Sequence, residues 1–210
     1  MTFTARRLGR TLVTVATASS LALLAGCSAD SDSNSSSADT TTTASSGSCA
    51  AVTDPLVTAS GEPEIALPQP SNWERNTSQD SELVRLVLVN TSLTKAGFTP
   101  NIVVTVTPST GAFDEIVDKE LATTRQGMGV DVPAGETSTI CGFEAYTFTY
   151  EASTVKDQPA HPVTSRIIVV PAVNGGSYTV MLTVQSTDPT NPTYIADSKA
   201  MLDGVQITAG

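Results

Sequence analysis

One break in composition decides how much of this chain can fold. Of the 21 residues from Ser28 to Ser48, nine are Ser, four are Thr and only three, all Ala, are apolar. Such a segment cannot bury enough apolar surface to offset its ordering entropy, so we expect residues 27–48 to form a disordered linker. The 162 residues from Cys49 to Gly210 remain, which is enough for a single domain with one core.

The residues before this linker have the pattern of an export signal. Arg6, Arg7 and Arg10 precede an apolar stretch from Leu12 to Ala25. A helix of about 14 residues is too short to cross a bilayer core of roughly 30 Å, but it is typical of signal peptides. The stretch ends in Leu-Ala-Gly directly before Cys27, and this ending resembles the lipobox of bacterial lipoproteins.

That resemblance implies cleavage before Cys27 and attachment of a diacylglyceryl group to its thiol. Residues 1–26 are then a lipoprotein signal peptide, and two or three acyl chains anchor the protein far more firmly than one. The alternative is an ordinary secretory signal that is cleaved near Ala25. We interpret the chain as exported, by the general or the twin-arginine route, and held by lipid at the outer face of the cell membrane, on the periplasm or cell-wall side.

Two cysteines, Cys49 and Cys141, remain once Cys27 is assigned to lipid. An even number of cysteines in an exported protein predicts a disulfide, here closing a loop of about 93 residues and tying the end of the linker to the domain. The competing interpretation is a catalytic cysteine paired with His161. No motif surrounds either cysteine or the histidine, so we predict the disulfide.

The charge balance excludes nucleic-acid binding. The chain has 11 Lys and Arg against 21 Asp and Glu, and its net charge of −10 has the wrong sign for a phosphate backbone. One His and three Cys offer little material for a metal site, so we expect neither a metal nor a cofactor. A monomer is the working assumption for the oligomeric state.

The hydrophobic pattern of residues 49–210 predicts an α+β fold. Asn174-Gly175 between two β-rich runs is a strong hairpin signal. One helix is expected from about Ala112 to Gln126, and a second from Asn191-Pro192 to Gly204. The order of strands and helices favours an antiparallel β-sheet flanked by two helices. The predicted strands are Glu64–Leu67, Leu83–Asn90, Ile102–Thr107, Thr137–Cys141, Phe143–Glu151, Arg166–Pro171, Ser177–Gln185 and Val205–Ile207.

Several of these segments occur in an order that is similar to a known family. They are Ile65-Ala66-Leu67-Pro68 followed by Pro70 and Trp73, the strand Ile102–Thr107 before an acidic helix, and Gly142-Phe143-Glu144-Ala145-Tyr146. With the lipobox and the linker, they resemble the LpqN/LpqT family of mycobacterial and related actinobacterial lipoproteins over roughly residues 62–208. The resemblance implies a PsbP-like fold, a central antiparallel sheet flanked by helices, and a location in the cell envelope. It supplies no catalytic residues, and the pairing of the cysteines is not part of it.

The sequence offers no constellation for catalysis, and we expect no enzyme. It contains no nucleophile elbow, H-E-x-x-H motif, phosphate-binding loop or CxxC pair. The carboxylates of Asp114, Glu115 and Asp118 fall on the polar side of the first predicted helix, where we interpret them as a solvated face. His161 has neither a nucleophile nor an orienting partner in its motif.

Three aromatic side chains are the candidate contacts of a ligand or partner. Trp73 follows a proline-rich turn, and Tyr146 and Tyr150 alternate with Phe148 along one face of a strand. Trp73 either closes one end of the core or presents an anchor, and the tyrosines either pack under a helix or line an apolar cavity. We predict a non-catalytic module that binds an envelope lipid or an envelope protein. The alternatives are an accessory structural lipoprotein without a pocket and a hydrolase with an unrecognised site.

Overall fold

The computed structural model describes Cys49 and residues 59–153, 159–173 and 175–210. These residues belong to one compact unit, Ala44–Gly210. The predicted signal peptide over residues 1–26, the lipidation site Cys27 and the linker over residues 27–48 lie outside the described residues. In the described part of the chain, no helix is long and apolar enough to cross a membrane.

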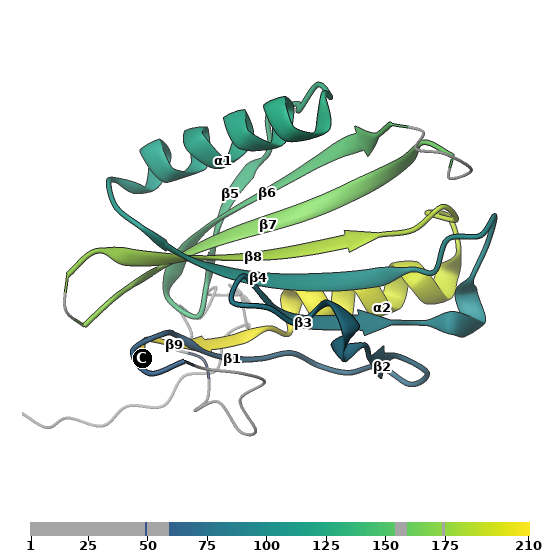
Figure 1. Ribbon diagram of the computed structural model, residues 1–210, viewed down its shortest axis with the longest axis horizontal. Coiled ribbons are helices and arrows are strands. Elements are labelled where there is room, and N and C mark those ends of the chain that lie inside the picture. Colours follow the sequence, from purple (N-terminus) through teal and green to yellow (C-terminus); the bar gives the residue numbers. More distant parts are fainter. Residues whose placement is uncertain (1–48, 50–58, 154–158, 174) are drawn as a thin grey trace, which may run out of the picture. The chain divides into compact units, whose positions relative to one another are not determined.

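A seven-stranded antiparallel sheet forms the centre of the domain (Figure 1). Its strand order is β2-β3-β4-β8-β7-β6-β5, and each neighbouring pair is antiparallel. The strands are β2 (Glu74–Arg75), β3 (Val84–Val89), β4 (Asn101–Ser109), β5 (Glu136–Ile140), β6 (Phe143–Ala152), β7 (His161–Pro171) and β8 (Ser177–Gln185).

A separate two-stranded ribbon joins the beginning of the described domain to its end. β1 (Glu64–Ala66) pairs antiparallel with β9 (Gln206–Thr208), with Ile65 opposite Ile207. Both of these isoleucines are buried in the main core. The ribbon therefore packs against the sheet as a small extra layer.

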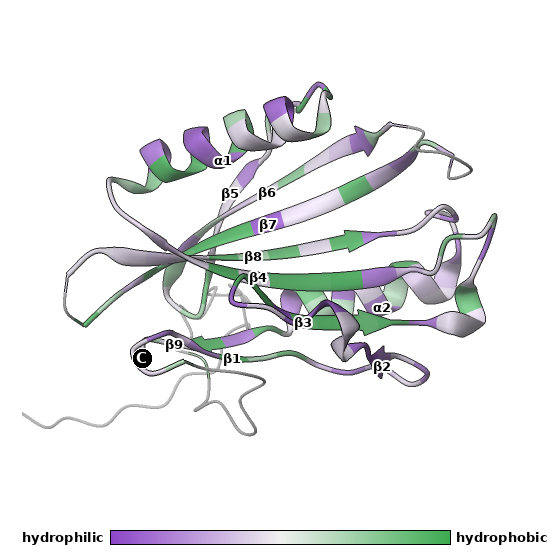
Figure 2. Cartoon of the chain, in the orientation of Figure 1, coloured by the Kyte–Doolittle hydropathy of each residue, from purple (hydrophilic) through white to green (hydrophobic). Residues whose placement is uncertain are grey.

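A helix covers each face of the large sheet (Figure 1). α1 (Phe113–Met128) packs on one face and α2 (Pro192–Asp203) on the other. Successive side chains of β6 point to opposite faces of the sheet. Phe148 therefore packs in the hydrophobic cluster under α1, and Ala145 packs in the cluster under α2. Figure 2 shows the apolar colouring along β3, β4 and β8. The predicted α+β architecture is confirmed.

Two 3-10 helices interrupt the connections on either side of β3. They are η1 (Thr77–Gln79) and η2 (Thr91–Leu93). Each begins after an asparagine, Asn76 or Asn90, whose side chain accepts a hydrogen bond from the backbone two residues on. These caps explain why both helices begin at an Asn-Thr-Ser sequence.

α1 extends beyond the end expected at Gln126. It continues through Gly127 to Met128 and ends where Gly129 adopts a left-handed backbone, with a φ of 64°. The N–H of Gly129 donates to the carbonyl of Arg125, which satisfies a free carbonyl of the last turn. A glycine takes this conformation without a Cβ clash, so the second of the two closely spaced glycines ends the helix.

β7 begins five residues earlier than the predicted strand Arg166–Pro171, so His161 lies within β7. Pro162 pairs with Glu151 of β6, whereas pairing with β8 starts only at Val163. A proline lacks a backbone N–H and is tolerated at such a strand end. The side chain of His161 is consequently buried, with 5 % of the residue exposed.

Candidate functional site

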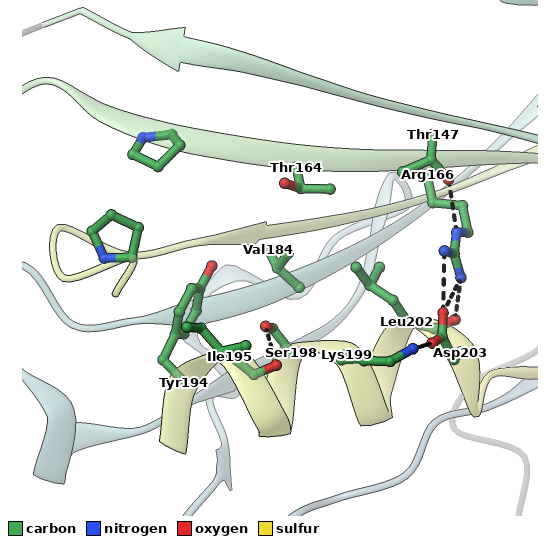
Figure 3. Close-up of a pocket in the computed structure, with 12 residues that line it drawn as sticks. Thr147, Thr164, Arg166, Val184, Tyr194, Ile195, Ser198, Lys199, Leu202 and Asp203 are labelled. Carbon is green, nitrogen blue, oxygen red and sulfur yellow. Dashed lines mark hydrogen bonds and ion pairs between the residues drawn. The ribbon is translucent and has the colours of Figure 1, made fainter. Parts of the chain in front are cut away.

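A groove lies between α2 and the large sheet, on the face opposite α1 (Figure 3). Its volume is about 410 Å³, within the range of roughly 300–1,000 Å³ that is usual for small-molecule sites. The sheet supplies Thr147, Pro162, Thr164, Arg166 and Val184. Pro189 and α2 supply the remainder, Tyr194, Ile195, Ser198, Lys199, Leu202 and Asp203.

The groove between α2 and the sheet stays open because several of the side chains that line it are small. The buried residues of α2 follow one stripe, Tyr194, Ser198, Met201 and Leu202, and its large members pack into the cluster formed with β3, β4 and β8. Ser198 and the threonines of β6 and β7 that line the groove are small and polar. Side chains of this size do not fill the space between α2 and β7.

One end of the groove is charged, and Arg166 is its centre. Nε of Arg166 donates to Oγ1 of Thr147 at 2.9 Å, and Nη1 donates to the carbonyl of Leu202 at 2.7 Å. Both terminal nitrogens contact Oδ1 of Asp203 at 3.2 Å. Lys199, one helical turn before Asp203, forms an ion pair with Oδ2 of the same carboxylate. Arg166 thus ties β7 to the last turn of α2.

These cations lower the pKa of the Asp203 carboxyl. The hydrogen bond from Lys199 is the largest cause, and the hydrogen bond and charge of Arg166 act in the same direction. Partial burial opposes them. The carboxylate is therefore ionised at neutral pH and bridges the two cations.

The opposite end of the groove is apolar (Figure 3). Tyr194 and Ile195 lie at this end, with Pro162 and Pro189 also in the lining. Tyr194 is buried, and this burial raises its pKa to about 12. Ile195 is 50 % exposed, a high value for a large apolar side chain. It borders the groove rather than packing into the core.

Two contacts outside the groove fix α2 in place. The side chain of Asn191 accepts hydrogen bonds from the backbone N–H groups of Thr193 and Tyr194 and so caps the helix. The indole Nε1 of Trp73 donates to Oδ2 of Asp197 at 2.8 Å. These contacts set the position of the helix that forms one wall of the groove.

The three aromatic candidates from the sequence lie in two different places. Trp73 is 2 % exposed and belongs to the core on the α2 side, where it bonds to α2 but does not line the groove. Tyr146 and Tyr150 lie with Phe148 in the core under α1, on the other face of the sheet. The hydroxyl of Tyr146 accepts a hydrogen bond from the N–H of Gly135 at 2.6 Å. Burial raises the pKa of Tyr150.

The two cysteines expected to pair do form a disulfide. The Cα atoms of Cys49 and Cys141 are 4.7 Å apart. Cys141 and Gly142 connect β5 to β6, and both have positive φ, 55° and 86°, as a type I′ hairpin turn requires. The N–H of Ile207 lies 3.3 Å from Sγ of Cys141. The disulfide therefore joins the chain entering the domain to this turn, beside β9.

The polar residues considered for catalysis lie on two elements, His161 at the start of β7 and the three carboxylates in the first turns of α1. Nδ1 of His161 lies 2.9 Å from the carbonyl oxygen of Pro159, and Nε2 lies 3.3 Å from Oε1 of Gln185. Asp114, Glu115 and Asp118 are exposed on α1, where Glu115 accepts a hydrogen bond from the N–H of Ala112. Among the described residues, no group of three or more His, Cys, Asp or Glu side chains could hold a metal ion.

A second cavity, of about 550 Å³, lies near the start of α1. Phe113, Val169 and Pro171 provide apolar surface, and Glu144 and Ser177 are among its polar members. Glu144 is exposed, and the Ser177 hydroxyl is within hydrogen-bonding distance of the Ser109 hydroxyl, at 2.8 Å. The groove at α2 is the better candidate site because a nearly buried arginine, Arg166, meets Asp203 and Lys199 at one of its ends.

Comparison with known proteins assigns the family. The family model described as "Probable lipoprotein LpqN" matches residues 52–208, most of the chain. The chain belongs to the LpqN family. The family expected from the sequence is thus confirmed, and Cys49 falls just outside the matched range. No curated protein sequence matches the chain.

Two solved structures resemble the LpqN-family domain. The first is the crystal structure of LpqN involved in cell envelope biogenesis of Mycobacterium tuberculosis, with 22 % identity and a TM-score of 0.55 over 71 % of this chain and 86 % of that chain. It supports the same fold. The second is the solution structure of cyanobacterial PsbP from Synechocystis, with 12 % identity and a TM-score of 0.45 over 77 % of this chain and 98 % of that one.

Sequence reasoning missed the charged end of the groove. The sequence did contain one signal for it. Arg166 is the only Lys, Arg, Asp or Glu in the segment from His161 to Pro171, and the rest of this segment is mostly apolar. A charged residue within such a strand points to a partner on a packed element. Its partner Asp203 lies 37 residues away, and nothing in the sequence pattern connects the two.

Proposed function

We propose that this LpqN-family protein is a lipid-anchored protein of the cell envelope that binds an envelope lipid in the groove at α2 and does not transform it. The observation that carries the proposal is the continuity of the groove with the core. Val184, Tyr194 and Leu202 line the groove and also belong to the core cluster on the α2 side. Ile195 lines the same groove and is half exposed, so an acyl chain placed against it removes apolar surface from water on both partners.

The hydrogen bonds inside the groove support binding rather than chemistry. The Ser198 hydroxyl donates to the carbonyl of Ile195, and the Thr164 hydroxyl bonds to that of Thr149. The Thr147 hydroxyl accepts from Arg166. A hydroxyl nucleophile needs an adjacent general base, and none of these contacts joins a hydroxyl to a carboxylate or an imidazole.

The proposed location depends on Cys27. Membership in a family of lipoproteins and the lipobox at Leu-Ala-Gly-Cys27 support acylation of this thiol and anchoring at the outer face of the cell membrane. Cells fed radiolabelled palmitate should label the protein and retain it in the membrane fraction. Cys27→Ser should abolish the label, because the variant lacks the thiol that is acylated. Unchanged labelling of this variant would contradict the anchor.

Native mass spectrometry with the lipids of the producing cells tests the binding function. The chain is expressed without residues 1–26 and carries Cys27→Ser, so that it can be studied without its anchor and without detergent. After incubation with a lipid extract, we expect adducts of discrete lipid mass. Ile195→Asp places a charge at the apolar end of the groove and should remove them. Val173→Asp is the matched control, because Val173 is 78 % exposed and does not line the groove.

Two further variants separate the groove from the aromatic residues singled out by the sequence. Tyr146→Phe and Tyr150→Phe alter the core under α1 and should leave the adducts unchanged. Adducts that survive Ile195→Asp but disappear in the tyrosine variants would place the ligand under α1 and overturn the groove. A spectrum without adducts would favour the alternative, a protein partner, which crosslinking in cells can then identify.

A further inference from the structure

The charged end of the groove indicates which head group the ligand has. This inference rests on the proposed lipid-binding function. We infer that the groove selects an amphiphile with an anionic head group, a carboxylate or a phosphate, which binds at Arg166 while its chain extends toward Ile195. Three features favour such a head group: the hydrogen-bonding capacity of Arg166, the way Asp203 contacts it, and the charge of the groove.

Arg166 is nearly buried and its hydrogen bonding is incomplete. Its side chain is 13 % exposed. A guanidinium has five N–H donors, and four contacts use them here, one to Thr147, one to the Leu202 carbonyl and two to Asp203. The second hydrogen of Nη2 has no acceptor in the described part of the chain. An anion reaching the guanidinium through the groove would supply one.

Asp203 binds Arg166 in a weaker geometry than the one a ligand anion can form. A single oxygen, Oδ1, meets both terminal nitrogens at 3.2 Å, while the other oxygen is taken by Lys199. The strongest arginine–carboxylate and arginine–phosphate pairs are bidentate, with two oxygens on two nitrogens at about 2.7–2.9 Å. The Asp203 side chain is 45 % exposed, so it can turn toward solvent when a ligand anion replaces it.

The charge of the groove favours an anion over a cation. Its lining includes two cations, Arg166 and Lys199, and one anion, Asp203. The Lys199 side chain is 76 % exposed and can follow a ligand head group. The end of α2 carries partial negative charge, which opposes a further anion beside it. A ligand head group is therefore expected to displace Asp203 rather than to bind next to it.

The length of the groove gives the orientation of the ligand. Ile195 and Asp203 are eight residues apart on α2, which corresponds to about 12 Å at 1.5 Å per residue. The apolar end at Ile195 suits an alkyl chain, and the charged end at Arg166 suits the head (Figure 3). An amphiphile with one chain of medium length spans this distance.

Calorimetric titration with four dodecyl probes that differ only in their head groups tests the inference. The probes are dodecanoate, dodecyl phosphate, dodecyl maltoside and dodecyltrimethylammonium, each below its micelle concentration, added to the chain without residues 1–26 that carries Cys27→Ser. The two anions should bind about tenfold more tightly than the neutral maltoside, the effect expected of hydrogen bonds to a charged group. The fluorescence of Trp73, whose indole bonds to α2, provides a second readout.

Substitutions at the charged end identify the group responsible. Arg166→Gln should reduce the affinity for both anions by about tenfold and leave the maltoside affinity unchanged. Asp203→Asn frees the guanidinium and should raise the anion affinity by about two- to fivefold, the range of a partly exposed ion pair. This gain keeps the test informative if Arg166→Gln does not fold. Lys119→Gln, on the exposed side of α1, is the control and should change nothing.

The outcomes separate this inference from the function on which it depends. If none of the four probes binds, lipid binding in the groove is wrong. If all four bind with similar affinity, or the maltoside binds most tightly, the groove binds amphiphiles but the anionic head group is wrong. A loss of anion affinity in Asp203→Asn would also overturn the inference, because the carboxylate would then assist the ligand instead of competing with it.

Discussion

Tyr194 links the apolar end of the groove to the stability of the domain. Its burial raises the pKa from the ordinary value of 10.0 to about 12. Below pH 10 the phenol is neutral in both the folded and the unfolded chain. Between pH 10 and 12 only the unfolded chain loses the proton, so the free energy of unfolding falls as the pH rises, by roughly 2–3 kcal/mol in total.

Urea denaturation at several pH values from about 9 to 12 measures this effect. Tyr194→Phe keeps the ring and removes the titrating group, so its free energy of unfolding should fall less over the same interval. Tyr150 is also buried and contributes to both proteins equally, so the difference between them reports Tyr194 alone. Parallel curves for the two proteins would show that Tyr194 is not buried in the folded state.

The hydrogen bond between Trp73 and Asp197 joins the core to α2. Asp197→Ala leaves the buried indole N–H without a partner, which costs about 1–3 kcal/mol. Asp197→Asn retains an acceptor oxygen and should recover most of that loss. Chemical denaturation followed by Trp73 fluorescence gives both values. Equal stability of the alanine variant and the natural protein would contradict the contact.

At the scale of elements, the sequence predicted what depends on local pattern. The position of α1, the start of α2 at Asn191-Pro192 and the alternation around Phe148 each follow from spacings within one segment. β2 has two residues and shows no periodicity. The β1–β9 pair joins segments about 140 residues apart, as the pairing of Glu64 with Thr208 shows. The hydrophobic pattern within one segment cannot predict a contact between segments so far apart.

The groove could not be predicted for the same reason. It depends on the position at which α2 packs on the sheet, and that position is set by contacts such as Trp73–Asp197 and Arg166–Asp203, which are distant in sequence. The aromatic stripe at Tyr146 and Tyr150 left two interpretations open, core and cavity. Helix α1 covers that face, so the structure places these tyrosines in a core.

The cap of α2 should contribute both to stability and to ligand binding. Asn191→Ala removes the side-chain acceptor for two N–H groups of the first turn and should cost about 1 kcal/mol of stability. The same turn carries Tyr194 and Ile195, so its fraying should also weaken amphiphile binding. Hydrogen exchange of the first turn and calorimetric titration measure the two effects. Asn191→Asp retains a capping oxygen and should behave like the natural protein in both.

At the scale of the whole molecule, the start and the end of the domain meet twice. The ribbon of β1 and β9 joins them by backbone hydrogen bonds, and the disulfide holds Cys49 against the turn beside β9. The two connections differ in their thermodynamic effect. The ribbon stabilises the folded state through its bonds and its buried isoleucines, whereas a disulfide acts largely by restricting the unfolded chain.

The disulfide closes a loop across more than half of the domain, with a sequence separation of 92. In the chain-entropy model, a loop of about this length contributes roughly 4–5 kcal/mol, so the double variant Cys49→Ser/Cys141→Ser should lose stability on that scale. Urea denaturation with and without dithiothreitol measures it. The reductant should destabilise the natural domain by a similar amount and leave the double variant unchanged, because only the former has a bond to break. The opposite outcome is a free energy of unfolding that stays the same in dithiothreitol although the two thiols become titratable. That result would contradict the prediction and show that the β1–β9 ribbon and the core stabilise the domain without the disulfide.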